Sequence, residues 1–346
     1  MSTPQQNPRD IDSIAETDSS STTITNEVYT YEALWPVYAF NFSYSPHYEY
    51  RLALSSLTEA RENALQVVQL QPETGRFIVK AEHPHPFPAT KVMWVPDVSD
   101  NSPDLFATTS DCLRIWSASD DGLTLESQLQ NNRNSQYCGP ITSFDWNPID
   151  KQIIGTASID FTCCIWDIQR KVLLKQILTH NKEVSDIAFG HDPNIFASVG
   201  WDGSVRRFDL RSLEQCAILF ESQDFTPLMR LVWNKVDPNY IAVIVMDSAS
   251  VLVLDIRQAG MPIIELNGHQ QPVNSICWAP NTDCYLCTAG DDKQTLIWDL
   301  RRSTGEIRDP HMMYNAQGEV VNLNWSVLQP EWVSIAFDNK VQLLRV

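Results

Sequence analysis

The 346-residue chain lacks several features that mark common functional classes. No run of about 18 apolar residues exists, which excludes a membrane-spanning helix. The N-terminus is polar and acidic from Asp10 to Asp18, so we expect no secretory signal peptide. Only 12 glycines are present, which argues against glycine-rich loops that cradle phosphates.

Catalytic motifs are missing as well. The sequence contains no G-x-S-x-G nucleophile elbow, no Walker loop, no H-E-x-x-H metal motif and no set of protein-kinase motifs. An active site assembled from distant segments would leave no such motif and remains the alternative. We expect a protein that is not an enzyme and uses no cofactor, metal ion or small-molecule substrate.

Positive charge is scarce. Lys and Arg number 25 against 43 Asp and Glu, which gives a net charge of −18. Nucleic-acid binding draws on clustered Lys and Arg, and none are clustered here, so we expect no direct contact with DNA or RNA. The eight cysteines lie mostly in apolar runs such as Cys163-Cys164. Without a signal peptide they predict reduced thiols and a location in the cytoplasm and nucleus.

Residues 1–27 differ from the rest of the chain. They contain no aromatic side chain and are rich in Ser, Thr and acidic residues. Such a segment cannot bury enough apolar surface to offset the entropy lost on ordering. We therefore predict a disordered acidic tail over 1–27 and one folded domain over 28–346.

A repeated phrase begins near Tyr29, in which alternating apolar residues lead to a large aromatic residue. Alternation of this kind is typical of a half-buried strand. The phrase occurs seven times at intervals of 43 to 52 residues, and later strands end in dipeptides such as Trp166-Asp167. This period and the WD dipeptide predict an all-β fold, a seven-bladed WD-repeat β-propeller. The closing aromatic residues are Phe42, Trp94, Trp146, Phe189, Trp233, Trp278 and Trp325.

The last repeat is one strand short. The sequence ends just after the third strand of that repeat, at 341–344. An open sheet edge at this point would be costly and prone to aggregation. The best unassigned β-prone segment is 28–31, and we predict that it supplies the fourth strand and closes the ring.

A second set of positions also recurs. A loop histidine, a strand Ser or Thr, a turn Asp and a third-strand Trp can form a hydrogen-bonded chain within one blade. The sixth repeat offers all four residues, which are His269, Thr288, Asp292 and Trp298. The fourth repeat offers three, which are His180, Ser198 and Asp202, but it has Phe208 in place of the donor Trp. The third repeat has Thr156, Asp160 and Trp166 without the histidine.

Two motifs suggest metal binding but have simpler interpretations. Cys284-x-x-Cys287 lacks a second ligand pair, and residues three apart on a strand point to opposite faces. In His83-Pro84-His85, the second histidine occupies the repeated loop-histidine position. We expect both motifs to be structural.

Two aromatic residues in turns are candidates for partner binding. Trp201 precedes the turn Asp202, where WD repeats usually carry a small residue, and Phe161 lies in the comparable turn of the third repeat. Trp is enriched at binding hot spots. Packing against neighbouring loops is the alternative interpretation of Trp201.

A four-residue box follows the third strand of three repeats. Trp298-Asp299-Leu300-Arg301 matches the W-D-x-R box with which some WD proteins dock on cullin ligases, and two further copies change only the first residue. The candidate docking residues for a cullin adaptor are Arg211, Arg257 and Arg301. A solvated surface arginine is the alternative in each case.

Local phrases beyond the generic repeat resemble one family. These phrases are Ile141–Asn147, Phe196–Val199, Trp233–Lys235, Asp237–Tyr240 and the C-terminal segment Gln329–Val346. They resemble the plant WD-repeat regulators known as transparent testa glabra and light-regulated WD proteins, whose animal member is an adaptor for dual-specificity tyrosine-regulated kinases. The resemblance covers about residues 28–346.

The resemblance implies a non-catalytic scaffold that assembles transcriptional-regulator or kinase complexes. Its partners would be proteins, namely transcription factors and protein kinases. The W-D-x-R boxes favour an alternative, a substrate receptor of a cullin-RING ubiquitin ligase.

Overall fold

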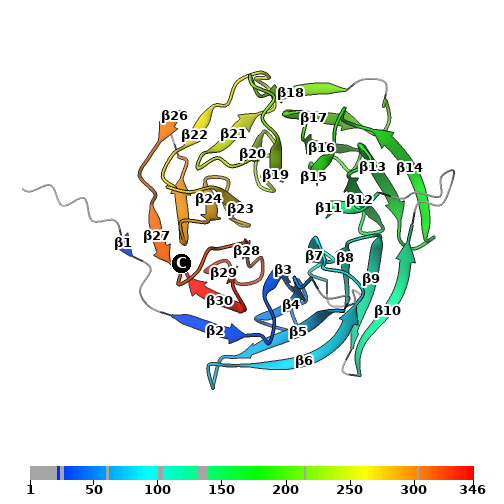
Figure 1. Cartoon of the computed structure of the whole chain (residues 1–346), viewed down its shortest axis with the longest axis vertical. Coiled ribbons are helices and arrows are strands. Elements are labelled where there is room, and N and C mark those ends of the chain that lie inside the picture. The colour runs from blue at the N-terminus through cyan, green and yellow to red at the C-terminus, as the bar shows by residue number, and fades with distance from the viewer. Residues whose placement is uncertain are drawn as a thin grey trace, which may run out of the picture.

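The computed structural model describes residues 22–23, 27–59, 62–99, 104–119, 121–130, 139–213, 216–301 and 304–346. Seven sheets stand around a central axis and form a closed ring (Figure 1). The prediction of an all-β, seven-bladed WD-repeat propeller is confirmed. In this described part of the chain there is no helix that could cross a membrane.

The first four blades follow the chain without interruption. Blade 1 consists of β3 (Val37–Phe42), β4 (Arg51–Ser56), β5 (Asn63–Gln71) and β6 (Arg76–His85). Blade 2 consists of β7 (Lys91–Trp94), β8 (Leu105–Thr109), β9 (Leu113–Ser119) and β10 (Gly122–Leu129). Blade 3 consists of β11 (Ile141–Trp146), β12 (Ile153–Ser158), β13 (Thr162–Asp167) and β14 (Val172–Leu178). Blade 4 consists of β15 (Val184–Phe189), β16 (Ile195–Gly200), β17 (Ser204–Asp209) and β18 (Ala217–Glu221).

The last three blades depart from this simple order. Blade 5 consists of β19 (Leu228–Trp233), β20 (Tyr240–Val245), β21 (Val251–Asp255) and β22 (Ile264–Leu266). Blade 6 consists of β23 (Val273–Trp278), β24 (Tyr285–Gly290), β25 (Gln294–Asp299) and β27 (Met312–Asn315). Blade 7 consists of β28 (Asn322–Trp325), β29 (Trp332–Phe337), β30 (Lys340–Arg345) and the N-terminal β2 (Val28–Glu32).

The innermost strand of every blade ends on one of the seven predicted aromatic residues. In five blades, its pairing with the second strand shifts register after the first residue, as between Val184 and Asp186 in blade 4. Such a bulge bends the strand and increases its twist. The twisted sheets pack face to face, and the described apolar residues form seven clusters, one between each pair of neighbouring blades.

The N-terminal strand β2 closes the ring at the position that the sequence predicts. It pairs antiparallel with β30, with Tyr29 opposite Leu343. The ring of Tyr29 lies 5.7 Å from that of Trp332 in the same blade. The hydroxyl of Tyr31 donates a hydrogen bond of 2.7 Å to Gln66 Oε1 in blade 1. The strand therefore completes blade 7 and also ties it to blade 1.

Two blades carry a fifth strand that the sequence analysis does not anticipate. β26 (Gly305–Ile307), from the connection after β25, pairs in parallel with β22 of blade 5. β1 (Thr22–Thr23) pairs in parallel with β27 of blade 6 (Figure 1). Both use outer edges whose backbone groups would otherwise lack a strand partner. β1 falls within the predicted 1–27 tail; residues 1–21 and 24–26 of that tail lie outside the described residues.

Two N-terminal truncations test ring closure. Deletion of residues 1–26 should leave the melting temperature nearly unchanged, because the two-residue pairing of β1 is the only contact that it removes among the described residues of this segment. Deletion of residues 1–33 also removes β2 and exposes the edge of β30, so we expect a fall of roughly 10 °C or more, or aggregation. Thermal unfolding of both variants decides the point, and equal melting temperatures would contradict closure by β2.

Candidate functional site

The two ends of the ring carry different sets of loops, because connections between antiparallel strands alternate between the ends. One end holds loop 179–183, before blade 4, and turn 201–203, between its second and third strands. We call this end the turn face. The opposite end holds the segments that follow third strands, such as 210–213, and we call it the box face.

The predicted chain of hydrogen bonds is complete in blade 6. His269 Nδ1 lies 2.9 Å from Asp292 Oδ2, and its Nε2 lies 2.7 Å from Thr288 Oγ1. Trp298 Nε1 donates to the same hydroxyl at 2.9 Å. The carboxylate accepts from His269 Nδ1–H, so the threonine hydroxyl can accept from the tryptophan and donate to Nε2. Every polar atom in this chain therefore has a partner.

Asp292 is held as a carboxylate. Burial raises its pKa, but hydrogen bonds from His269 and from the backbone N–H of Gln270 outweigh burial, so the pKa of Asp292 lies below its ordinary value. The backbone N–H of Gln294 also donates to Asp292 Oδ1, at 3.1 Å. The aspartate thus joins the loop before the blade to the turn within it.

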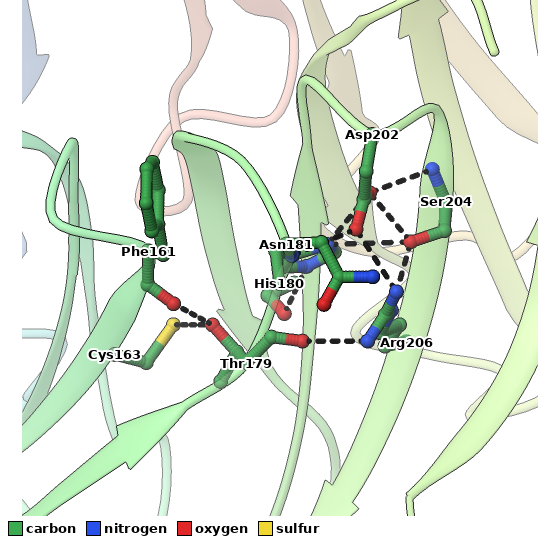
Figure 2. Close-up of polar contacts among 9 residues, drawn as sticks. Phe161, Cys163, Thr179, His180, Asn181, Asp202, Ser204 and Arg206 are labelled. Atoms are coloured by element: carbon green, nitrogen blue, oxygen red, sulfur yellow. Dashed lines mark hydrogen bonds and ion pairs between the residues drawn. The ribbon is translucent and has the colours of Figure 1, made fainter.

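Blade 4 completes the chain differently (Figure 2). His180 lies 2.9 Å from Asp202 Oδ1 and 2.8 Å from Ser198 Oγ, as predicted from the sequence. The indole donor is replaced by Phe208, which is buried and stacks on Phe196 with ring centroids 5.1 Å apart. Here the chain continues through an arginine rather than through the third-strand aromatic residue.

Arg206 is a member of this network that the sequence analysis misses. Its Nη2 lies 2.9 Å from Asp202 Oδ2, and its Nη1 donates to the carbonyl oxygen of Thr179 at 3.1 Å. Burial raises the pKa of Asp202, but hydrogen bonds from His180 and Ser204 outweigh burial and hold it well below its ordinary value. The available signal was a charged residue at a strand position where blade 6 has Leu296.

Blade 2 has a shorter version of the chain. His85 Nε2 lies 3.0 Å from Thr108 Oγ1, and Trp116 Nε1 donates to the same hydroxyl at 2.9 Å. His85 Nδ1 faces the carbonyl oxygen of Phe87 rather than a carboxylate, so Nδ1 carries the proton. Burial lowers the pKa of His85 to about 4. The histidine is therefore neutral at pH 7 and structural, as expected from the sequence.

The remaining residues considered as metal ligands make hydrogen bonds or are at least partly buried in the blades. In blade 3, Trp166 Nε1 donates to Thr156 Oγ1 at 2.9 Å, while Asp160 accepts from Thr162. Cys287 is buried and Cys284 is partly buried, and both are free thiols. Within the described ranges, no three His, Cys, Asp or Glu side chains form a group that could hold a metal ion.

The turn face exposes aromatic side chains on neighbouring blades. Trp201 is 38% exposed and Phe161 is 39% exposed, so neither of these predicted binding residues is enclosed by packing. Phe225, in the loop after blade 4, is 59% exposed and was missed by the sequence analysis. The sequence signal was an aromatic residue inside the polar segment 222–226. We call Phe161, Trp201 and Phe225 the aromatic cluster.

Backbone contacts connect the three loops of the aromatic cluster. The carbonyl oxygen of Phe161 accepts hydrogen bonds from the N–H groups of Thr179 and His180, at 3.1 and 3.3 Å. On the other side, a Cβ on Gly203 would come within 2.9 Å of the Phe225 backbone, so only glycine fits there. Phe161 and Phe225 have positive φ angles of 71° and 52°. Bulky residues rarely adopt this conformation, and it persists only where the surroundings fix it.

The three box arginines adopt one geometry on the box face of blades 4, 5 and 6. In each box the guanidinium forms a bidentate ion pair with the carboxylate of the aspartate two residues earlier. Nε lies 2.8 Å from Asp209 Oδ1 in blade 4, 2.9 Å from Asp255 Oδ1 in blade 5 and 2.9 Å from Asp299 Oδ1 in blade 6. Hydrogen bonds from Arg211 hold the pKa of Asp209 at about 2.

Each box arginine also has a second contact within its blade. Arg211 reaches Asp192 at 3.1 Å, Arg257 lies over the ring of Tyr240 at 5.9 Å, and Arg301 donates to the Tyr285 hydroxyl at 2.7 Å. Their side chains nevertheless remain 57%, 58% and 60% exposed. The structure thus presents three oriented guanidinium groups to solvent at equivalent positions on neighbouring blades.

Comparison with known proteins identifies the repeats. The family described as "WD domain, G-beta repeat" matches residues 131–167, 171–209 and 260–299. These are the repeats of blades 3, 4 and 6, in which the turn aspartate precedes the third-strand aromatic residue by six positions. The other repeats depart further from this pattern.

One similar protein spans nearly the whole chain, and two others span about four fifths of it. The "DDB1- and CUL4-associated factor 7 homolog" of Dictyostelium discoideum is 46% identical over 92% of this chain and 98% of its own length. A WD repeat-containing protein of Saccharomyces cerevisiae is 35% identical over 80% of this chain but only 59% of its own length. Another, from Schizosaccharomyces pombe, is 34% identical over 78% of this chain and 69% of its own length.

These similarities correct the family inferred from local phrases. The similar protein that matches nearly end to end is named for association with DDB1 and CUL4. The resemblance to the plant transparent testa glabra and light-regulated WD proteins, and to the kinase adaptor, was therefore wrong. It rested on a few local phrases, and short segments of a repeat protein are constrained mainly by the blade itself.

The blade 6 chain can be tested by Asp292→Ala. The substitution leaves His269 and two backbone N–H groups without their acceptor, so we expect a loss of about 1–3 kcal/mol in the free energy of unfolding. Asp224→Ala, an exposed change in a turn-face loop, should cost less than about 0.5 kcal/mol. Denaturant midpoints that shift equally in both variants would contradict the assignment.

His85 should make stability depend on pH. An unfolded histidine titrates near 6.5, whereas His85 in the fold titrates at about 4. Between these values only the unfolded chain binds the proton, so this contribution is complete above about pH 6.5 and is lost as pH falls toward 4. We expect wild type to lose roughly 2 kcal/mol more than His85→Gln over this range, measured by urea unfolding. Parallel pH profiles would contradict the prediction.

Proposed function

This chain belongs to the family of WD-repeat proteins that includes the DDB1- and CUL4-associated factor 7 homolog, and from that membership we propose that it is a substrate receptor of a cullin-RING ubiquitin ligase. In this proposal the protein is a non-catalytic scaffold. It binds DDB1 through the box face and a client protein through the turn face. It thereby holds the client near the ligase.

The observation that carries the proposal is the repeated geometry of the box arginines. Arg211, Arg257 and Arg301 are each fixed by an ion pair to their own aspartate, yet more than half of each side chain is exposed. A guanidinium that is already oriented loses little further conformational entropy when it binds. Three such groups on adjacent blades make a surface suited to a partner with carbonyl or carboxylate acceptors.

The aromatic cluster supports client binding at the other end of the ring. Exposed aromatic residues on a rigid support are typical of interaction hot spots. Trp201 and Phe225 lie in loops that contact each other through Gly203, which limits their freedom before a partner binds. Seven apolar interfaces between blades fix the two faces relative to each other. The geometry suits simultaneous binding of two proteins.

The proposal also includes the classes of client protein and the cellular compartment. Transcription factors and protein kinases are the client classes to be tested first. Four of the seven cysteines that the structure describes are buried, which supports action in the reducing cytoplasm and nucleus.

Two sets of variants should separate the two faces. Arg257→Ala combined with Arg301→Ala should weaken binding of purified DDB1 at least about tenfold, because two oriented donors are lost. Arg170→Ala is the matched control: it is 77% exposed and lies 3.5 Å from the WD aspartate of blade 3, but it follows a box with Gln169 in the arginine position. Binding is measured by titration calorimetry, after equal melting temperatures have been verified.

Trp201→Ala provides the reciprocal test. It should leave DDB1 binding unchanged and reduce recovery of client proteins that co-purify with wild type and with the arginine variant. Tight DDB1 binding by the arginine variant would overturn the docking assignment. Full recovery of clients by a stable Trp201→Ala protein would return that tryptophan to a packing role.

A further inference from the structure

A cavity of about 230 Å³ opens on the turn face of blade 1, two to three blades along the ring from the aromatic cluster. Its walls come from the loop after β2, the ends of β4 and β6 and the start of β5. The side chains that define its character are Trp35, Asn63, Ala64, Glu62, Glu82 and His83.

The size of the cavity limits its ligand. Sites for complete drug-sized molecules usually measure about 300–1,000 Å³. A volume of about 230 Å³ lies below that range and accommodates one long side chain of a protein partner. We therefore consider an anchor residue rather than a free cofactor.

The charge of the lining selects a cation. Glu62 and Glu82 line the cavity, and its nine lining residues include no Lys or Arg. Glu82 is held in place because its Oε2 accepts a hydrogen bond of 3.1 Å from Gln66 Nε2. Gln66 in turn accepts from Tyr31 of the closing strand β2. The same strand that closes the ring thus positions a carboxylate at the cavity.

Trp35 adds an aromatic surface to the same cavity. Its side chain is half-buried in the loop that follows β2. A guanidinium stacks on indole and pairs with carboxylates through parallel hydrogen bonds, whereas an ammonium does neither as well. Ala64 and Pro84 offer apolar contact for the stem of a long basic side chain.

The surface around the cavity indicates how the anchor would be presented. Leu34 is 98% exposed and directly precedes Trp35. Leu57 and Phe87, on neighbouring turn-face segments, are 46% and 50% exposed. A partner segment with apolar residues beside an arginine would cover these side chains and place the arginine in the cavity.

We propose that this cavity is a binding site for an arginine side chain of a partner protein, held by Glu62, Glu82 and Trp35. The site is separate from the box arginines and from the aromatic cluster. The proposal of an arginine site does not depend on whether the protein serves a ubiquitin ligase.

The site can be tested with small probes. The protein is labelled with 5-fluorotryptophan, and the Trp35 signal in its ¹⁹F spectrum is identified by its disappearance in Trp35→Phe. N-acetyl-arginine amide should shift this signal saturably, with a dissociation constant in the millimolar range. The citrulline analogue, which is nearly the same shape but uncharged, should shift it at least tenfold less at equal concentration.

Variants of the carboxylates complete the test. Glu62→Gln combined with Glu82→Gln should weaken arginine binding at least fivefold, while Glu59→Gln, an exposed change in the same turn outside the cavity lining, should not. Unchanged signals from the other tryptophans verify the fold. Equal shifts with citrulline, a shift that never saturates, or full binding by the double variant would overturn the proposal. Tighter binding of Nα-acetyl-lysine amide, whose side-chain ammonium is free, would overturn the choice of arginine. DDB1 is not used, so failure here is independent of the proposed ligase function.

Discussion

The innermost strands of the ring must satisfy backbone N–H groups that have no strand partner on their channel side. A buried N–H without an acceptor costs about as much as a lost hydrogen bond. The structure solves this with polar side chains that reach from one blade to the next: Asp145 accepts from the N–H of Phe189 at 2.8 Å, and Asp186 from that of Leu231 at 3.0 Å. Asn41, Ser275 and Asn324 act in the same way. Each blade therefore depends on its neighbour, and the ring depends on its closure.

This mutual dependence explains why the proposed binding sites lie at the two ends of the ring. The interior is occupied by apolar clusters and by buried polar bridges, and Asp145 and Asp186 are themselves balanced by Lys235 at 3.6 Å and Lys91 at 3.7 Å. Side chains committed to such contacts are not free to bind partners. Loop side chains are not needed for these contacts between blades, so loops can present exposed groups on a rigid support. The box arginines and the aromatic cluster occupy these loops at opposite ends.

Repetition made much of the fold predictable. One aromatic residue per repeat located all seven inner strands, and a shared offset joined His269, Thr288, Asp292 and Trp298 into one hydrogen-bonded chain. Departures from the repeat were harder to interpret. Arg206 has a counterpart in blade 2, where Arg114 lies opposite Thr108 as Arg206 lies opposite Ser198, but blades 3 and 6 have Cys164 and Leu296 at this position. Phe225 lies in a loop outside the repeated strands, so periodicity gave it no role. The family assignment from short phrases was wrong because the same blade constraints act on all WD repeats.

The sequence by itself determined the number of blades, the position of each inner strand and the residues of the structural chains, because alternation and repeat offset are local properties. Apart from the closing strand β2, only the tertiary structure decided which distant segments meet. The parallel addition of β26 to blade 5, the link from Tyr31 through Gln66 to Glu82, and the contact of Gly203 with Phe225 all join residues from different elements. Such contacts depend on ring closure and on the relative placement of blades, which no local pattern specifies. The strand positions could therefore be predicted from the sequence, whereas the contacts between distant elements and the surfaces that they form required the three-dimensional structure.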